Sequence, residues 1–160
     1  MFRLGKLTDY GTVVMTALAA EPVRVHSAQE LSATTHVSAP TVSKILKRLA
    51  KNGLVEALRG AHGGYRLARL QEHITVADIV RALEGPIALT RCSEHAGQCS
   101  MESDCATSAN WQLINTAIRE ALEAVTLAQM TSRSQARRTQ VNVQPLTFHP
   151  TARETAQRAR

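Results

Sequence analysis

Apolar residues recur every three or four positions in five segments of the chain, which is the spacing of one face of an α-helix. We expect helices over residues 8–20, 28–34, 39–51, 76–83 and 108–126. Residues that favour helix N-caps stand at the first four of these starts, at Thr8, Ser27, Ser38 and Thr75. In the first helix, the stripe expected to face the core is Tyr10, Val13, Val14, Ala17 and Leu18.

A β-hairpin is predicted between the third and fourth helices. Its strands are residues 54–58 and 65–67, joined by the turn-rich tip 59–64. The second and third helices are separated by a three-residue turn, which is typical of a helix-turn-helix, and a hairpin directly after it is typical of a wing. The sequence therefore predicts a mainly α fold, a winged helix-turn-helix domain with a two-stranded wing.

The third helix carries the residues that we expect to contact DNA. Its first turn has short side chains that can make single hydrogen bonds to base edges or touch a thymine methyl group, at Ser38, Pro40, Thr41 and Ser43. Basic side chains that can reach phosphates follow, at Lys44, Lys47, Arg48 and Lys51. At the wing tip, Arg59 can enter a narrow minor groove. A basic helix face alone is often only a solvated surface, but with the turn and the wing it indicates DNA binding.

The charge is distributed unevenly along the chain, which has a formal net charge of +6. Residues 1–60 hold eight Lys and Arg against four Asp and Glu, and residues 61–130 are net acidic. Residues 131–160 hold six arginines against one acid. The excess in the first part supports nucleic-acid binding there. The last part is polar, Arg-rich and without pattern, so we predict a disordered tail.

Three cysteines, Cys92, Cys99 and Cys105, lie in a polar segment without periodicity. An odd number of closely spaced cysteines argues against a disulfide framework and towards metal or redox chemistry. Their spacing is wider than the C-x2-C of structural zinc sites and suits an iron–sulfur cluster. Zinc with His95 as a fourth ligand, and free redox thiols, are the alternatives. A fourth cluster ligand can be solvent, a small molecule or a nearby side chain: Glu94, His95, Glu102, Asp104 or Ser108.

The last predicted helix has one apolar stripe on an otherwise polar surface, formed by Trp111, Ile114, Ile118, Leu122 and Val125. A helix of this length beside a small winged domain has little of its own chain to cover. We therefore predict that it is a dimerisation helix that pairs antiparallel with its copy in a homodimer. Two recognition helices would then lie about 34 Å apart, one DNA turn, on an inverted repeat of double-stranded operator DNA.

Together these features resemble the Rrf2 family of bacterial regulators over residues 1–130. The stretches that carry the resemblance are Leu7–Gly11, Val37–Leu49, Lys51–Val55, Arg59–Tyr65, the three cysteines, the helix of Trp111 and Thr126-Leu127. The resemblance implies a sensor with a [2Fe-2S] or [4Fe-4S] cluster that binds palindromic operators as a dimer. The opening Phe2-Arg3-Leu4 is most similar to regulators of the SUF cluster-assembly operon. A repressor that senses nitric oxide or redox state is the alternative within the family.

The chain departs from the cluster-biogenesis branch of this family at two positions. Ser108 stands where that branch has a histidine three residues after the third cysteine, and Ser43 stands where it has an acidic residue in the recognition helix. In the nitric-oxide-sensing branch, an acidic residue on the first helix of the partner subunit completes the cluster, and Asp9 matches that position. Asp9 is also explained as a first-turn acid that the helix dipole favours.

We expect four segments: a winged helix-turn-helix domain over 1–85, a cluster-binding loop over 86–107, the dimerisation helix over 108–130 and a disordered basic tail over 131–160. No apolar run is long enough to span a membrane and the start lacks a signal-peptide pattern, so a cytoplasmic protein is expected. No catalytic triad order, carboxylate pair or phosphate-binding glycine loop indicates an enzyme. Outside the regulators, the alternative is a zinc-stabilised module that binds protein and not DNA.

Overall fold

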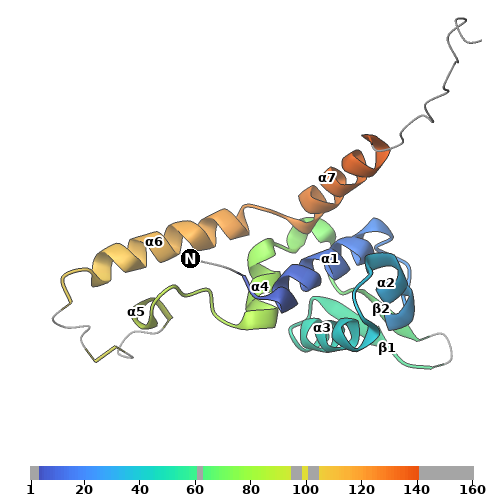
Figure 1. Ribbon diagram of the computed structural model, residues 1–160, viewed down its shortest axis with the longest axis horizontal. Coiled ribbons are helices and arrows are strands. Elements are labelled where there is room, and N and C mark those ends of the chain that lie inside the picture. Colours follow the sequence, from blue (N-terminus) through green and yellow to red (C-terminus); the bar gives the residue numbers. More distant parts are fainter. Residues whose placement is uncertain (1–3, 61–62, 95–98, 101–104, 141–160) are drawn as a thin grey trace, which may run out of the picture.

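The computed structural model describes residues 4–60, 63–94, 99–100 and 105–140. Helices α1 to α4 and a two-stranded hairpin form one compact group, from which α6 extends away (Figure 1). This architecture confirms the predicted mainly α winged-helix fold. The elements are α1 (Lys6–Ala20), α2 (Ala28–Thr35), α3 (Ala39–Lys51), β1 (Val55–Leu58), β2 (Gly64–Leu67), the short 3-10 helix η1 (Gln71–His73), α4 (Val76–Glu84), α5 (Arg91–Glu94), α6 (Ser108–Glu123) and α7 (Leu127–Gln140).

The core of the compact group is aliphatic. The largest side chains that are fully buried come from α1, α2, α3, α4, the loops beside the hairpin and the start of α7: Val14, Met15, Leu18, Leu31, Ile45, Leu46, Leu49, Leu54, Ile74, Ile79, Leu83 and Leu127. Tyr65 is the aromatic residue among the half-buried side chains that pack on this cluster. Burial of these side chains is the main force that holds α3 against α1 and α4.

The predicted N-cap at Thr8 is wrong, because the N-cap lies three residues earlier and α1 begins at Lys6. Gly5 is the N-cap, and its carbonyl accepts hydrogen bonds from the main-chain N–H groups of Thr8 and Asp9, both at 3.1 Å. The N–H of Gly5 itself donates to Glu84 Oε1 at 2.7 Å, so a contact with α4 fixes the start of the helix. Thr8 is fully buried, and its hydroxyl has no hydrogen-bond partner among the described residues.

The predicted core stripe of α1 is only partly right. Val14 and Leu18 are buried, but Tyr10 and Val13 are 38% and 42% exposed. The reason is Gly11, which is buried against α4: a Cβ added there would lie 2.1 Å from Leu83 Cδ1. The absence of a side chain lets α1 approach α4 closely, and this rotates Tyr10 and Val13 outwards.

Local capping signals fixed the starts of α2 and α4 as predicted. Ser27 and Glu30 form a reciprocal capping box at α2, and Thr75 and Asp78 form one at α4. Ser38 occupies the N-cap position of α3, but its hydroxyl pairs with Thr41 Oγ1 at 2.8 Å instead of capping a main-chain N–H. Its carbonyl accepts the N–H of Val42 at 3.0 Å.

The hairpin pairs β1 and β2 antiparallel, with Val55 opposite Leu67 and Leu58 opposite Gly64. His26, just before α2, forms an isolated antiparallel bridge with β2. Its N–H donates to the carbonyl of Tyr65 at 2.9 Å, and its carbonyl accepts the N–H of Tyr65 at 2.8 Å. The wing is therefore attached to the helix-turn-helix through Tyr65, near the tip end of β2. Ala61 and His62 at the predicted tip lie outside the described residues.

The C-terminal half differs from the predicted boundaries. The helix expected over 108–126 ends at Glu123, and a second helix, α7, continues to Gln140 where a disordered tail was expected from Thr131. Leu127 and Thr131 are buried, and the N–H of Leu127 donates to the carbonyl of Ile74 at 2.8 Å, so α7 begins by packing on the winged domain. Residues 141–160 of the predicted tail lie outside the described residues. Among the described helices, none has both the length and the apolar content needed to span a bilayer.

Candidate DNA-binding surface and cysteine loop

The two faces of α3 have opposite character. Val42, Ile45, Leu46 and Leu49 are fully buried on one side. On the other side Ser38, Pro40, Lys44, Lys47 and Lys51 are exposed, and Thr41 and Ser43 are half-buried. The core therefore holds the helix while the predicted base-reading and phosphate-contacting side chains face solvent, as a helix that enters a major groove requires.

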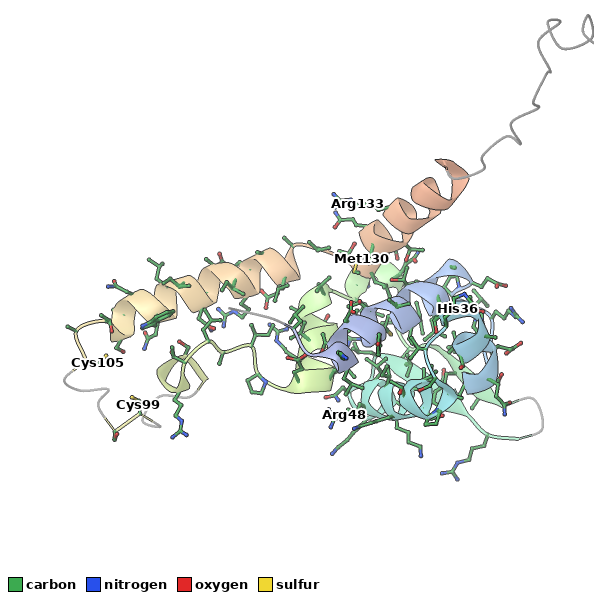
Figure 2. The ribbon with its side chains drawn as sticks, viewed as in Figure 1. His36, Arg48, Cys99, Cys105, Met130 and Arg133 are labelled. Atoms are coloured by element: carbon green, nitrogen blue, oxygen red, sulfur yellow. The ribbon has the colours of Figure 1, made fainter. Side chains whose placement is uncertain are left out.

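Arg48 is placed differently from the lysines of α3. Its guanidinium Nη1 donates a hydrogen bond of 2.5 Å to the carbonyl of Leu83, in the last turn of α4. The side chain of the neighbouring Asn52 donates to the carbonyl of Ala82 at 3.4 Å. A cation at a helix C-terminus satisfies carbonyls that have no partner within the helix. Arg48 was predicted to contact phosphate, and here it ties the recognition helix to α4; Figure 2 labels it at the α3 end of the domain.

The turn between α2 and α3 is built from local hydrogen bonds. His36 ends α2 in the left-handed conformation, with φ of 58°. The hydroxyl of Ser32 donates to the carbonyl of Val37 at 2.6 Å, and the hydroxyl of Thr35 donates to the carbonyl of Leu31 at 2.6 Å. The bond of Ser32 thus ties α2 to Val37, in the turn that precedes α3.

At the wing, Arg59 is exposed and follows β1 directly. Gly63 lies where a Cβ would meet the carbonyl oxygen of Leu58 at 2.4 Å, which explains a glycine on the return side of the tip. An ion pair of 2.9 Å between Arg66 and Glu56 joins the two strands on their exposed face. Both Arg59 and α3 thus belong to the part of the fold that winged-helix proteins present to DNA.

A hollow of about 350 Å³ lies between the start of α1 and the start of α3. Its lining includes the exposed Asp9 together with Ser38 and Thr41 of the recognition helix. The structure therefore brings the predicted acidic cluster ligand next to predicted base-reading residues. Among the described residues, those that line this hollow beside Asp9 include no cysteine.

The cysteine loop lies at the far end of α6 from the winged domain, where Figure 2 labels Cys99 and Cys105. Both are half-buried free thiols. The hydroxyl of Thr107, 3.4 Å from Cys105 Sγ, lowers the pKa of the Cys105 thiol, and the main-chain N–H groups of Thr107 and Ser108 act in the same direction. A thiolate is the form that ligates a metal, so Cys105 fits a metal-binding role.

The third cysteine and the other candidate ligands are not placed by the structure. Cys92 falls in α5, but its side chain lies outside the described residues, as do His95, Glu102 and Asp104. Within the described ranges no three His, Cys, Asp or Glu side chains converge on one point. The helical turn α5 was not predicted, because it is too short to show a period. Ser108 lies in the first turn of α6.

Asn115 is a residue of this region that sequence reasoning missed. It is the one residue that α6 buries in the described chain. Its Oδ1 accepts the N–H of Leu89 at 3.1 Å, and its Nδ2 donates to the carbonyl of Ile87 at 3.1 Å. This amide reproduces a main-chain pairing and holds the segment between α4 and α5 against α6. A single polar residue beside an apolar stripe gives no signal of this role in a sequence.

The apolar stripe of α6 is largely uncovered within the single chain. Trp111 and Ile114 are exposed, and Ile118, Leu122 and Val125 are half-buried. Leu113, off the predicted stripe, is 71% exposed. The exposed apolar surface is thus broader than the stripe that the sequence predicted.

Comparison with known proteins identifies the class of regulator. Residues 4–133 match the family Rrf2, described as iron-dependent transcriptional regulators. The chain belongs to the Rrf2 family. It is 35% identical over 124 residues to protein aau3 of Rhizobium meliloti, covering 76% of this chain and 75% of that protein.

Two solved Rrf2-type structures share its fold. The structure titled as CymR, the global cysteine regulator of B. subtilis, has a TM-score of 0.67 and 30% identity, covering 83% of this chain and 98% of that one. T. potens IscR has a TM-score of 0.65 and 28% identity, covering 92% and 97%. The Rrf2 assignment makes this chain a DNA-binding transcription regulator and not an enzyme.

Proposed function

We propose that this Rrf2 regulator is a homodimer whose affinity for an inverted-repeat operator is set by an iron–sulfur cluster on Cys92, Cys99 and Cys105. The observation that carries the proposal is the cysteine loop itself, where Cys99 and Cys105 are half-buried free thiols and the pKa of Cys105 is lowered. The iron dependence in the family description supports the same reading. The regulated genes are proposed to be a SUF-type cluster-assembly operon.

The residues present suit such a cluster chemically. Iron–sulfur clusters are held by thiolates, and when bound the cluster supplies a centre that changes with redox state or is lost on damage. The chain favours the thiolate form at Cys105, because the hydroxyl of Thr107 lowers the pKa of that thiol. Helix α6 begins directly after this cysteine, at Ser108.

A second copy of the chain would cover the exposed face of α6. Trp111, Leu113 and Ile114 together form an apolar surface that water would otherwise contact. In a two-fold dimer the recognition helices would lie about 34 Å apart, which matches consecutive major grooves on one side of DNA. The DNA contacts proposed are those of Ser38, Pro40, Thr41, Ser43, Lys44, Lys47, Lys51 and Arg59, with Arg48 as a structural member of the same helix.

Asp9 is proposed as the ligand that a partner subunit contributes. It is exposed, and it shares a hollow with the first turn of the recognition helix. A cluster bound there would touch the DNA-binding domain of the other subunit directly. Asp9→Asn should therefore lose cluster faster than wild type on dilution, and Cys99→Ala should lose it altogether; retention equal to wild type in Asp9→Asn would remove Asp9 from the ligand set.

A regulator that works through thiols without a cluster is the second candidate. It is favoured by the likeness to the structure titled as a global cysteine regulator and by the two half-buried free thiols. Anaerobic purification distinguishes the cluster-dependent regulator from the thiol-dependent one. The proposal expects a brown protein with iron and acid-labile sulfide in equal amounts, near one cluster per chain. A colourless protein with one tightly bound zinc, or with no metal, would contradict it.

A further inference from the structure

Four hydrogen bonds and ion pairs from three helices meet at the last turn of α4. We name this turn, Arg81–Glu84, the α4 junction. From α3, Arg48 donates to the carbonyl of Leu83 at 2.5 Å, and Asn52 donates to that of Ala82 at 3.4 Å. From α1, the N–H of Gly5 donates to Glu84 at 2.7 Å. From α6, Glu123 forms an ion pair with Arg81.

A second connection begins directly after the α4 junction. The chain leaves α4 at Gly85, in a conformation with φ of 101° that favours glycine, and runs towards α5 and the first cysteine. The side chain of Asn115 in α6 is hydrogen-bonded to this segment, at the carbonyl of Ile87 and the N–H of Leu89. The segment that joins α4 to α5 is therefore hydrogen-bonded to α6 at Ile87 and Leu89, through the side chain of Asn115.

We infer that the α4 junction transmits the state of the cysteine loop to the recognition helix, and that Asn115 and Arg48 are the positioning residues of this route. The inference rests on the proposed function, because it assigns the path along which the cluster state would reach the DNA-binding surface. The route begins at Asn115, since this side chain holds the segment 87–89, which leads to the cysteine loop, against α6. The route ends at Arg48, since this residue joins the α4 junction to α3, the helix that we propose reads DNA.

The physical basis is that moving one of these segments alone would break its hydrogen bonds to the next. Asn115 is buried, so displacing the segment 87–89 would leave its amide and two main-chain groups without partners, which costs free energy. A shift of that segment instead moves Gly85 and the carbonyls at the end of α4. Because Arg48 and Asn52 are bonded to those carbonyls, α3 follows. Gly5 is bonded to the same turn, so the start of α1 and the neighbouring Asp9 follow as well.

The test compares Asn115→Ala with Gln112→Ala, which removes an exposed amide one turn earlier on the same helix. Amide hydrogen exchange is measured by mass spectrometry on the full-length, cluster-free protein. The inference expects faster exchange in Asn115→Ala both at residues 82–89 and at residues 45–52 of α3, and wild-type exchange at both in Gln112→Ala. A change that stops at residue 89 and leaves 45–52 as in wild type would overturn the inference.

The second measurement is the operator affinity of each variant with and without its cluster. Allosteric coupling of ordinary size would give the wild type a ratio of about 5–150 between the two forms. Asn115→Ala should bind the same amount of iron and sulfide and bring this ratio close to one. A wild-type ratio in that variant would overturn the inference. Asn115→Asp keeps the acceptor for Leu89 and loses the donor to Ile87, so a reduced but measurable ratio is expected from it.

The two measurements separate this inference from the proposed function. If the wild type has a ratio of one, the cluster does not control DNA binding and the proposed function fails. The hydrogen-exchange result still decides whether the α4 junction connects the loop segment to α3.

Discussion

Arg48 lies on the recognition helix, yet its guanidinium donates a 2.5 Å hydrogen bond to the carbonyl of Leu83 in α4. A basic residue of a DNA-reading helix is thus used to fix the position of that helix. The other basic side chains of α3, those of Lys44, Lys47 and Lys51, are exposed. The helix therefore combines one anchoring residue with the residues that we propose contact DNA.

Arg48→Ala should lower the free energy of unfolding by about 1–2 kcal/mol, because it removes a charged hydrogen bond and leaves the helix-terminal carbonyl of Leu83 without this donor. Lys47→Ala is the matched control on the same helix and should change the free energy of unfolding by less than about 0.5 kcal/mol. Urea denaturation followed by circular dichroism measures both. Equal effects of the two changes would show that Arg48 is an ordinary surface cation.

Lys47→Ala should weaken binding to every DNA sequence by a similar factor and reduce the slope of log affinity against log salt by about one, as loss of one phosphate contact does. The exposed Lys47 stands on the face opposite the buried Leu46 and Leu49. Fluorescence anisotropy at several salt concentrations gives the slope. Arg119→Ala removes an exposed cation of α6 and serves as control; an identical fall in slope there would contradict the assignment of the DNA surface to α3.

Thr8→Val should leave stability unchanged or raise it by up to about 1 kcal/mol. The Thr8 hydroxyl is fully buried without a partner among the described residues, so an isosteric methyl group removes a desolvation cost. Thermal unfolding measures the effect, with Thr12→Val as comparison because its hydroxyl donates to the carbonyl of Asp9 at 2.7 Å. A drop of several degrees in Thr8→Val would mean that the hydroxyl has a partner in the assembled protein.

Cys105 of the metal-free protein should react with iodoacetamide at a lower pH than an ordinary cysteine. Its pKa is lowered, so at any given pH near neutrality its thiolate fraction is larger than that of an ordinary cysteine. Thr107→Val removes the hydroxyl that makes the largest contribution and should move the midpoint of alkylation upwards. Mass spectrometry of the peptide carrying Cys105 gives the rate at each pH. A midpoint that does not move would assign the shift to the helix start alone.

Ile114→Glu should convert the proposed dimer to monomers, because it places a charge on the exposed apolar face of α6. The fold of the single chain should survive, since Ile114 contributes little to its core. Sedimentation velocity gives the mass, and circular dichroism checks the helix content. Gln112→Glu adds the same charge at an exposed position and should leave the mass unchanged; a dimer in Ile114→Glu would place the interface elsewhere.

Local signals predicted most of the winged domain correctly, because Ser27 and Thr75 cap their helices through residues three positions away. The prediction failed where a contact with a residue distant in sequence determines where a helix begins or which face it buries. The start of α1 depends on Glu84 and not on the nearby Thr8, and the inward face of α1 depends on Gly11 fitting against Leu83. Neither relation is visible from spacing, because both join residues more than seventy positions apart.

The candidate site was predictable in its ingredients and not in its connections. The exposed basic residues of α3 followed from residue type and spacing, and so did the choice of Cys99 and Cys105 as candidate ligands. The roles of Arg48 and Asn115 did not, because a surface cation and a surface amide have the same appearance in sequence whether they bond solvent or the main chain of another element. Helix α7 was missed because its polar composition hides the buried Leu127 that attaches it.

The most direct test of the account is a titration of labelled inverted-repeat DNA with this protein under anaerobic conditions, once with a reconstituted cluster and once after the cluster has been removed. The account predicts a dissociation constant that differs by about 5–150-fold between the two forms and a loss of this difference in Cys99→Ala. Identical dissociation constants with a fully loaded cluster would contradict it.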